Sequence, residues 1–168
     1  MNIILQTPRL IIREFLPEEE QLFLDHFTDE EMLLYLPKRS RDERINIFHK
    51  ALANYANSKT LGTWGMFHKI NGDLVGSCLL RLYNDLPGKV EVGYSIERKY
   101  WGVGIGTEMA IAMVGHAFAD AGTTEVIGVT VPANIASQRV LEKAGLVRGD
   151  NFKRDDVELA YFRITSPL

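Results

Sequence analysis

Hydrophobic and polar residues follow two different spacings along this chain, and the spacings separate strands from helices. Short apolar stretches that alternate or are rich in β-branched residues predict strands over 9–14, 63–70, 74–82, 89–96, 125–131, 146–153 and 157–164. Apolar residues three or four positions apart predict helices after Pro17, over 41–57, from 109 to about 121, and over 134–145. The order of these elements predicts one mixed α/β domain over 1–168.

Turn residues indicate how these elements are joined. Asn71-Gly72 separates two predicted strands, and both of its positions favour positive φ, so we expect a hairpin there. Asp155-Asp156 predicts a second hairpin between the last two strands. Gly122 and Gly145 are placed to end helices in the left-handed conformation.

Composition narrows the class of protein. Of 168 residues, 46% are hydrophobic and 24% charged, which is typical of a globular domain with a full core. The net charge of −3 provides no broad positive field, so no nucleic-acid partner is expected. No apolar run approaches the ~20 residues that cross a bilayer, and no basic-then-apolar leader opens the chain, so we expect a cytoplasmic protein without a membrane partner.

Cysteine and histidine usage predicts no metal site. Cys78 is the single cysteine and lies in the apolar run 75–80, which favours buried packing over a catalytic thiol. The four histidines lack the spacing of metal ligands; they are His26, His49, His68 and His116.

Glycine occupies every second position of a short segment between the strand 89–96 and the following helix. The glycines are Gly102, Gly104 and Gly106. Without Cβ atoms, such a loop can adopt unusual dihedrals and direct several N–H groups at one bulky anion. The next helix adds unpaired amides and the positive end of its dipole. The segment therefore predicts a pyrophosphate-binding loop.

The spacing around these glycines separates three kinds of phosphate loop. A nucleoside triphosphate loop needs Lys and then Ser or Thr after its last glycine, whereas Gly106 is followed by Thr107 and Glu108. A dinucleotide fingerprint needs a further glycine three positions on, which neither glycine pair has. Glu125 does lie about twenty residues on, where a ribose-binding acid is expected, so a dinucleotide site stays open.

A family resemblance supports the third kind of loop. Residues 94–108 resemble the coenzyme A motif of the GNAT superfamily of N-acetyltransferases, with Trp101 at the position that is commonly Gln or Arg. An aromatic-glycine pair there is typical of the branch related to ribosomal-protein-alanine N-acetyltransferases, and 7–13 and 134–146 resemble the same branch. The resemblance implies a mixed central sheet of about six or seven strands, splayed at its two central parallel strands and flanked by about four helices.

The resemblance also implies a site for acetyl-CoA. The amides of 103–107 would grip the diphosphate, the backbone of Ser95 and Ile96 would hold the pantetheine arm and the acetyl carbonyl, and Arg98 and Lys99 are candidates to offset phosphate charge. The residues expected to bind the cofactor are Ser95, Ile96, Trp101, Gly102, Val103, Gly104, Ile105, Gly106, Thr107, Asn134, Ser137, Arg139 and Lys143.

Three residues are candidates for proton transfer. Glu91 is the candidate base for the amine, because it is an acid on the strand that should line the site; a structurally paired strand acid is its alternative interpretation. Ser137 is the candidate proton donor to the departing thiolate, with helix capping around Asn134 as the alternative, and Tyr94 is a second candidate donor.

These residues predict an N-acetyltransferase that passes the acetyl group of acetyl-CoA to a primary amine by direct attack in a ternary complex, without metal. The amine is either a protein N-terminal α-amine or a small-molecule amine. A non-catalytic acyl-CoA-binding module is the alternative. Neither the acceptor nor a choice between monomer and dimer follows from the sequence. Four aromatic residues are conceivable liners of an acceptor pocket, but a place in the core is the favoured interpretation; they are Phe15, Tyr35, Trp64 and Phe152.

Overall fold

The predicted strands and helices follow one another in the expected order in a computed structural model that describes residues 1–167. The strands are β1 (Ile3–Gln6), β2 (Leu10–Arg13), β3 (Gly62–His68), β4 (Leu74–Leu82), β5 (Lys89–Ile96), β6 (Glu125–Thr130), β7 (Val147–Arg148), β8 (Phe152–Arg154) and β9 (Val157–Thr165). The helices are α1 (Glu20–His26), α2 (Glu30–Leu33), α3 (Arg41–Asn54), α4 (Ile105–Ala119) and α5 (Ile135–Lys143), with 3₁₀ turns η1 (Pro17–Glu19), η2 (Tyr83–Asp85) and η3 (Arg98–Tyr100).

The chain packs as two compact units, and each unit is built from two separate stretches of sequence. The first unit comprises 1–79 and 94–105, and the second comprises 80–93 and 106–168. β4 and β5 each run through the boundary, so both strands contribute to both units.

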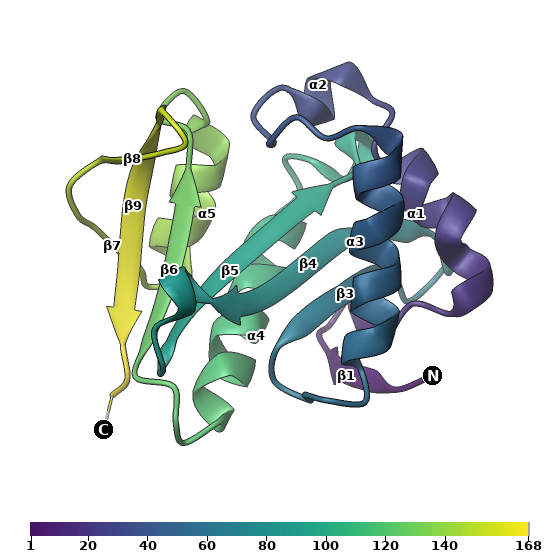
Figure 1. Ribbon diagram of the computed structural model, residues 1–168, viewed down its shortest axis with the longest axis horizontal. Helices are drawn as coiled ribbons and strands as arrows, with labels where there is room; N and C mark the ends of the chain where they lie inside the picture. Colours follow the sequence, from purple (N-terminus) through teal and green to yellow (C-terminus); the bar gives the residue numbers. More distant parts are fainter. Residues whose placement is uncertain (168) are drawn as a thin grey trace. The chain divides into compact units, whose positions relative to one another are not determined.

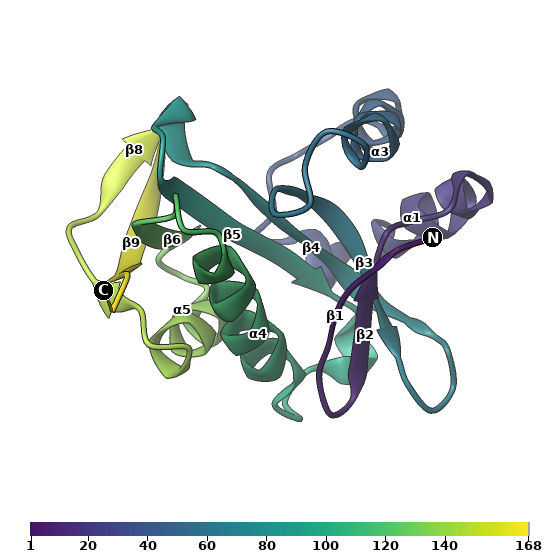
Figure 2. The same cartoon turned by 90° about the horizontal axis from the view of Figure 1, so that it is seen from below.

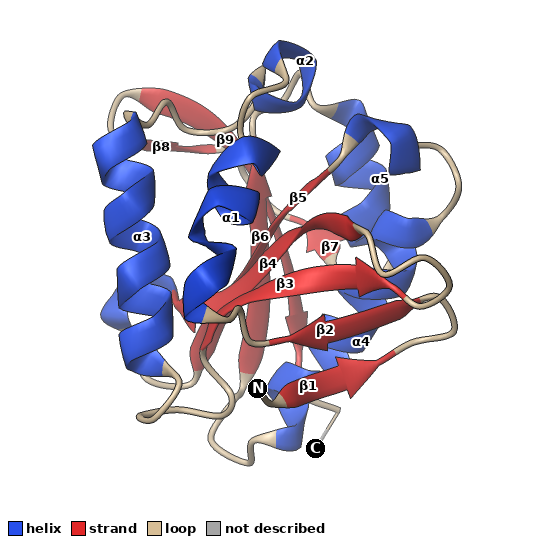
Figure 3. Ribbon diagram, turned by 90° about the vertical axis from the view of Figure 1, so that its right-hand side faces the viewer, coloured by secondary structure: helices blue, strands red, loops and turns tan. Residues whose placement is uncertain are grey.

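In the first unit, an antiparallel meander carries two helices. β1 pairs with β2, and β2 pairs with β3 from Leu10–His68 to Arg13–Gly65 (Figures 2 and 3). α1 and α3 contact each other, and α3 also contacts β3. Ser40 begins α3 with a capping box, because its hydroxyl accepts from the amide of Glu43 while the Glu43 carboxylate accepts from the Ser40 amide.

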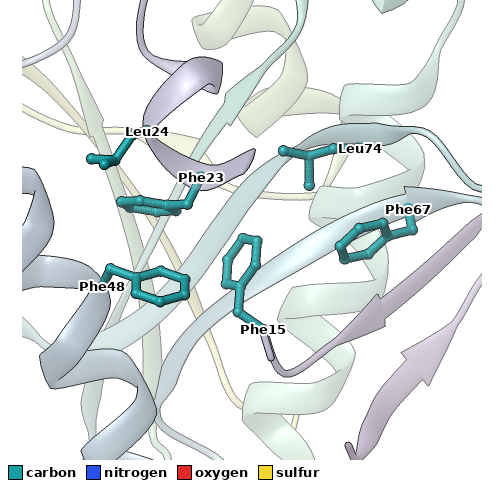
Figure 4. Packing of buried hydrophobic residues seen from close by; sticks show 6 residues of the cluster. All are labelled: Phe15, Phe23, Leu24, Phe48, Phe67 and Leu74. Carbon is teal, nitrogen blue, oxygen red and sulfur yellow. The ribbon is translucent and has the colours of Figure 1, made fainter. Parts of the chain in front are cut away.

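Phenylalanine rings fill the space between these elements (Figure 4). The ring of Phe15 lies 5.5 Å from that of Phe23, 5.7 Å from that of Phe48 and 6.2 Å from that of Phe67, in tilted or edge-on arrangements. Phe15 and Trp64 are 2% and 1% exposed, so both are core residues and not pocket liners. Cys78 is buried as predicted.

In the second unit, β6 is the central strand. Lys89–Val92 of β5 pair in parallel with Glu125–Gly128 of β6, and β9 pairs antiparallel with the whole of β6. α5 packs against β6 and β9 (Figure 1). The approach is close, because a Cβ added at Gly128 would lie 2.5 Å from a methyl carbon of Leu141.

The strand count differs from the expected six or seven for two local reasons. β1 was not predicted, and the stretch expected as one strand over 146–153 divides into β7 and β8, which pair with different parts of β9. The closing hairpin itself is confirmed, with Asp155 and Asp156 at φ 50° and 63°.

Two of the turn predictions need correction. Gly72 has φ 74° but Asn71 does not have positive φ, since the connection runs from His68 to Asp73 and Asn71 uses its side chain to accept from the Asp73 amide. Gly122 is not left-handed: α4 ends at Ala119, and the Asp120 carboxylate accepts from the Gly122 amide instead.

The predicted stop at the end of α5 is confirmed. Gly145 has φ 97° and donates its amide to the carbonyl of Glu142, while the amide of Leu146 donates to the carbonyl of Leu141. These paired bonds are those of a Schellman motif, and they satisfy carbonyls that the helix end would leave free.

Candidate functional site

The glycine loop has the backbone that its sequence predicts at two of three positions. Gly102 and Gly104 have φ 71° and 82°, values that residues other than glycine rarely adopt. Gly106 is different, because it lies in the first turn of α4. The amides of Ile105, Gly106 and Thr107 are therefore at the helix N-terminus, where no helical carbonyl precedes them. Such a turn favours an anion with several acceptor oxygens.

Two side chains hold this loop in place. Arg9 Nη1 donates to the carbonyl oxygen of Val103 at 2.7 Å, which ties the opening motif of the sequence to the loop. Trp101 Nε1 donates to the carbonyl oxygen of Ile96 at 2.8 Å and so fixes the loop to the end of β5. Trp101 stays 46% exposed. The aromatic residue of the motif therefore braces the loop through its ring nitrogen.

The end of β5 lies against β4 with little room to spare. A Cβ added at Gly76 of β4 would collide with the carbonyl oxygen of Ser95, and the amide of Glu97 donates to the carbonyl of Val75 at 2.7 Å. The backbone position of Ser95 and Ile96 is therefore set by direct contact with β4.

Ser95 also takes part in a buried hydrogen-bonded chain that was not predicted from the sequence. Its hydroxyl oxygen lies 2.7 Å from Nε2 of His26, and Nδ1 of His26 lies 2.8 Å from a carboxylate oxygen of Glu97. His26 ends α1 and is 2% exposed, whereas Ser95 and Glu97 are two positions apart at the end of β5. Strand spacing indicates only that Ser95 and Glu97 share one face, because residues two apart do so, and it does not identify His26 as their partner.

Burial sets the protonation of His26. Desolvation lowers the pKa of the imidazole below its ordinary value, and the charge of Arg44 acts in the same direction. The hydrogen bond and charge of Glu97 oppose this effect without overcoming it. The lowered pKa favours the neutral form of the imidazole.

In the second unit, Glu91 is a buried carboxylate held by two arginines. One oxygen accepts from Arg81 Nε at 2.8 Å and the other from Arg154 Nη1 at 3.0 Å. The Glu91 side chain is 5% exposed, and those of Arg81 and Arg154 are 54% and 29% exposed. Both oxygens are thus engaged, which corresponds to the paired-acid alternative; a role as base remains a prediction.

Asn134 caps α5 as expected. Its side-chain oxygen accepts from the amide of Ser137 at 3.2 Å, which places Ser137 in the first turn of the helix. Arg139 and Lys143 are exposed and four positions apart on α5, where their side chains extend into solvent.

Two other candidates for balancing phosphate charge have protein partners. Arg98 pairs with Asp29 at 2.9 Å and with Glu31 at 3.2 Å. Lys99 pairs with Asp73 at 3.0 Å, a hydrogen bond that raises the pKa of its ammonium group. These contacts connect η3 to the start of α2 and to the turn before β4.

The candidate site residues divide between the two units. Tyr94, Ser95, Ile96 and 101–105 belong to the first, where the Trp101–Ile96 hydrogen bond joins the loop to β5. The second unit contains the others, namely Glu91, Gly106, Thr107, Asn134, Ser137, Arg139 and Lys143.

A match to a known family decides the class of protein. The model of the acetyltransferase (GNAT) domain matches residues 9–147, which include the glycine loop and α5. The chain belongs to the GNAT acetyltransferase family. It is accordingly an acyltransferase that uses acetyl-CoA as its acyl donor.

Similar proteins place this GNAT chain among N-acetyltransferases. It is 25% identical over 145 residues to the uncharacterized N-acetyltransferase YoaA of Bacillus subtilis, covering 84% of this chain and 81% of that one. It is 34% identical over 121 residues to FsC-acetyl coenzyme A-N(2)-transacetylase of Aspergillus fumigatus, covering 67% of this chain and half of that protein. The ribosomal-protein-S5-alanine acetyltransferase of Vibrio fischeri has the same fold, with a TM-score of 0.81 at 15% identity over 97% of this chain and 96% of that one.

Two further features of residues 1–167 bear on metals and membranes. Within that range, no group of three or more His, Cys, Asp or Glu side chains is arranged to hold a metal ion. In the same part of the chain, every helix is too short or too polar to cross a bilayer.

Proposed function

We propose that this GNAT enzyme acetylates a primary amine by direct attack on the thioester of acetyl-CoA within a ternary complex. The observation that carries the proposal is the pair of left-handed glycines, Gly102 and Gly104, immediately before the N-terminus of α4. The loop suits a diphosphate, because its first-turn amides and the helix dipole point to one place.

The remaining contacts of the donor are proposed for the end of β5 and for α5. The backbone groups of Ser95 and Ile96 would hold the pantetheine arm, and an N–H of this strand directed at the acetyl carbonyl would stabilise the oxyanion formed on attack. Arg139 and Lys143 are exposed on α5 and are the cations that would offset phosphate charge.

Ser137 would protonate the departing thiolate. Its backbone amide donates to the side-chain oxygen of Asn134, and this cap holds Ser137 in the first turn of α5. Tyr94 is the second candidate for this proton. An α-amine, with a pKa near ~8, loses its proton more readily than a lysine near ~10.4, which favours acceptors of low pKa at neutral pH.

The activity is tested with a panel of amines and detection of free thiol. One arm contains peptides that begin with alanine, because the Vibrio fischeri protein is an alanine acetyltransferase. The other arm contains small-molecule amines. We expect thiol release to depend on at least one amine. Tight acetyl-CoA binding with no transfer to any amine would instead support a binding module.

Substitution of Ser137 tests the thiolate donor. We expect Ser137→Ala to lower kcat by about 10²-fold, because general acid catalysis typically contributes that much, while the Kd for acetyl-CoA stays within a few-fold. Steady-state kinetics and calorimetry give the two quantities. Ile135→Ala, a change at an exposed position of the same helix turn, is the control. An unchanged kcat would remove Ser137 from the mechanism.

A further inference from the structure

The buried chain Ser95–His26–Glu97 lies at the end of β5, where the proposed function places the acetyl group. The three residues belong to one unit, and their two hydrogen bonds are 2.7 and 2.8 Å long. The order of atoms is hydroxyl, Nε2, Nδ1 and carboxylate, which is the order used by hydrolases that take a proton from serine.

The carboxylate of Glu97 fixes the tautomer of His26. An ionised carboxylate only accepts hydrogen bonds, so Nδ1 of His26 must carry the hydrogen that joins them. In a neutral imidazole, Nε2 then has a lone pair and accepts from the Ser95 hydroxyl. The chain therefore has a direction: a proton that reaches Ser95 can pass to His26.

The surroundings oppose a lasting charge on His26, so a proton that the imidazole accepts is readily released. The His26 side chain is fully buried, whereas 29% of the Glu97 side chain is exposed, so one end of the chain reaches solvent. The charged groups that act on His26 are Glu97, from the segment after β5, and Arg44, from α3. The ring of Phe27 packs edge-on against the imidazole at 4.7 Å and helps to exclude water.

We propose that Ser95, His26 and Glu97 form the proton relay that deprotonates the amine during attack. This inference rests on the proposed function. As the C–N bond forms, an N–H proton of the amine passes to the Ser95 oxygen while the Ser95 hydroxyl proton passes to Nε2 of His26. The Glu97 carboxylate stabilises the resulting imidazolium. The C–S bond then breaks, and the thiolate takes a proton from water or from Ser137, which water reprotonates. After the product leaves, Nε2 of His26 returns its proton to the Ser95 oxygen, and Ser95 releases the proton that came from the amine to solvent.

The relay assigns distinct roles to its members. Ser95 contacts the reacting amine and is a catalytic residue, whereas His26 and Glu97 act through it and are positioning residues. With Ser95 accepting the amine proton, the Glu91 carboxylate needs only a structural role, in its ion pairs with Arg81 and Arg154. The relay leaves direct attack unchanged, because the acetyl group never resides on the enzyme.

The first test compares pH profiles of acetyl transfer. We expect Ser95→Ala and His26→Gln to lower kcat by about 10²-fold. In these variants log kcat should still rise with pH in the range where the wild-type value is constant, because the amine must lose its proton unaided. Glu97→Gln keeps the hydrogen bond and removes the charge, so we expect a loss of about 10-fold with an unfolding temperature close to that of the wild type. Glu97→Gln keeps the test valid if His26→Gln fails to fold.

A surface histidine provides the matched control. His49 contacts Glu20 at 2.6 Å in the same unit, and its side chain is 59% exposed. His49→Gln should leave kcat and its pH profile unchanged. If the wild type is active and the three relay variants have its pH profile, the relay is wrong while the acetyltransferase assignment stands. An acetyl adduct on Ser95, found by peptide mass spectrometry during turnover, would also overturn the relay.

A second measurement needs no acceptor. Nitrogen-15 NMR of His26 in the isolated protein should show hydrogen on Nδ1 at neutral pH and a pKa below the ordinary value of ~6.5. Hydrogen on Nε2 instead would overturn the relay even if no amine substrate has been found. Failure of the amine panel with the expected tautomer present would count against the proposed function and, with it, the relay.

Discussion

At the scale of single residues, the ion pairs show what a sequence can and cannot reveal. Glu91 stands out in the sequence as an acid among apolar residues, but its partners Arg81 and Arg154 are 10 and 63 positions away. Nothing in local spacing identifies such partners. The same holds for His26, whose contacts lie 69 and 71 positions away. Residue types and their immediate neighbours were predictable, whereas partners brought by the fold were not.

The Glu91 pair makes a prediction about stability. Glu91→Gln removes a buried charge that two arginines face, so we expect the free energy of unfolding to fall by about 2 kcal/mol. Urea denaturation measures it. Arg154→Met in the Glu91→Gln background should cost less than Arg154→Met alone, because its partner charge is already gone. Additive losses would show that the contact contributes nothing, and Glu158→Gln at an exposed strand position is the control.

Glu19 makes a prediction about acid stability. Burial acts to raise the pKa of its carboxyl, but two hydrogen bonds from Arg13 at 2.7 and 2.9 Å and one from the Leu16 amide lower it on balance. The stabilisation is therefore present above the unfolded pKa and is lost as pH falls through the folded pKa.

We expect Glu19→Gln to cost on the order of 1 kcal/mol at pH 7, and the difference from the wild type to shrink below about pH 4. Denaturation midpoints measured at several pH values check this. Glu18→Gln, one position earlier and exposed, should show no such convergence. A gap between Glu19→Gln and the wild type that persists at low pH would contradict the assigned cause.

At the scale of elements, local chemistry was the best guide. The glycine loop, the Asn134 cap and the Gly145 stop were predictable because each depends on backbone conformation within a few residues. β1 and the division between β7 and β8 were not, since strands of two to four residues are too short for their alternation to identify them and form only by pairing with a neighbouring strand. The loop was found from its glycines, but its bracing by Arg9, 94 residues away, required the fold.

The contact between β4 and β5 yields a prediction at this scale. Gly76→Ala places a Cβ against the carbonyl oxygen of Ser95, and this backbone atom cannot rotate away as the end of a side chain can. We expect a loss of about 1–3 kcal/mol from overpacking and weaker acetyl-CoA binding, because Ser95 and Ile96 must shift. Urea denaturation and calorimetry measure the two effects. Gly115→Ala, where an added Cβ meets open space in α4, should stabilise or be neutral, and equal effects of both substitutions would contradict the steric argument.

At the scale of the whole molecule, two units share two strands. Because β4 and β5 run through both, we expect one cooperative unfolding transition. Both tryptophans, Trp64 and Trp101, lie in the first unit, so their fluorescence reports on that unit, whereas circular dichroism reports on both. Superimposable urea curves from the two probes are the expected result. Separate midpoints would show that the units unfold independently.

The interleaving of the units also bears on how the chain is made by the ribosome. Residues 1–79 emerge first, but the carbonyl of Val75 has its partner in Glu97 and Gly76 packs on Ser95. Because the chain emerges from its N-terminal end, 80–93, the opening stretch of the other unit, leaves the tunnel before 94–105 does. A nascent chain stopped between these stretches would expose the unfinished edge of β4, which makes pausing there a hazard for aggregation and a natural place for chaperone binding.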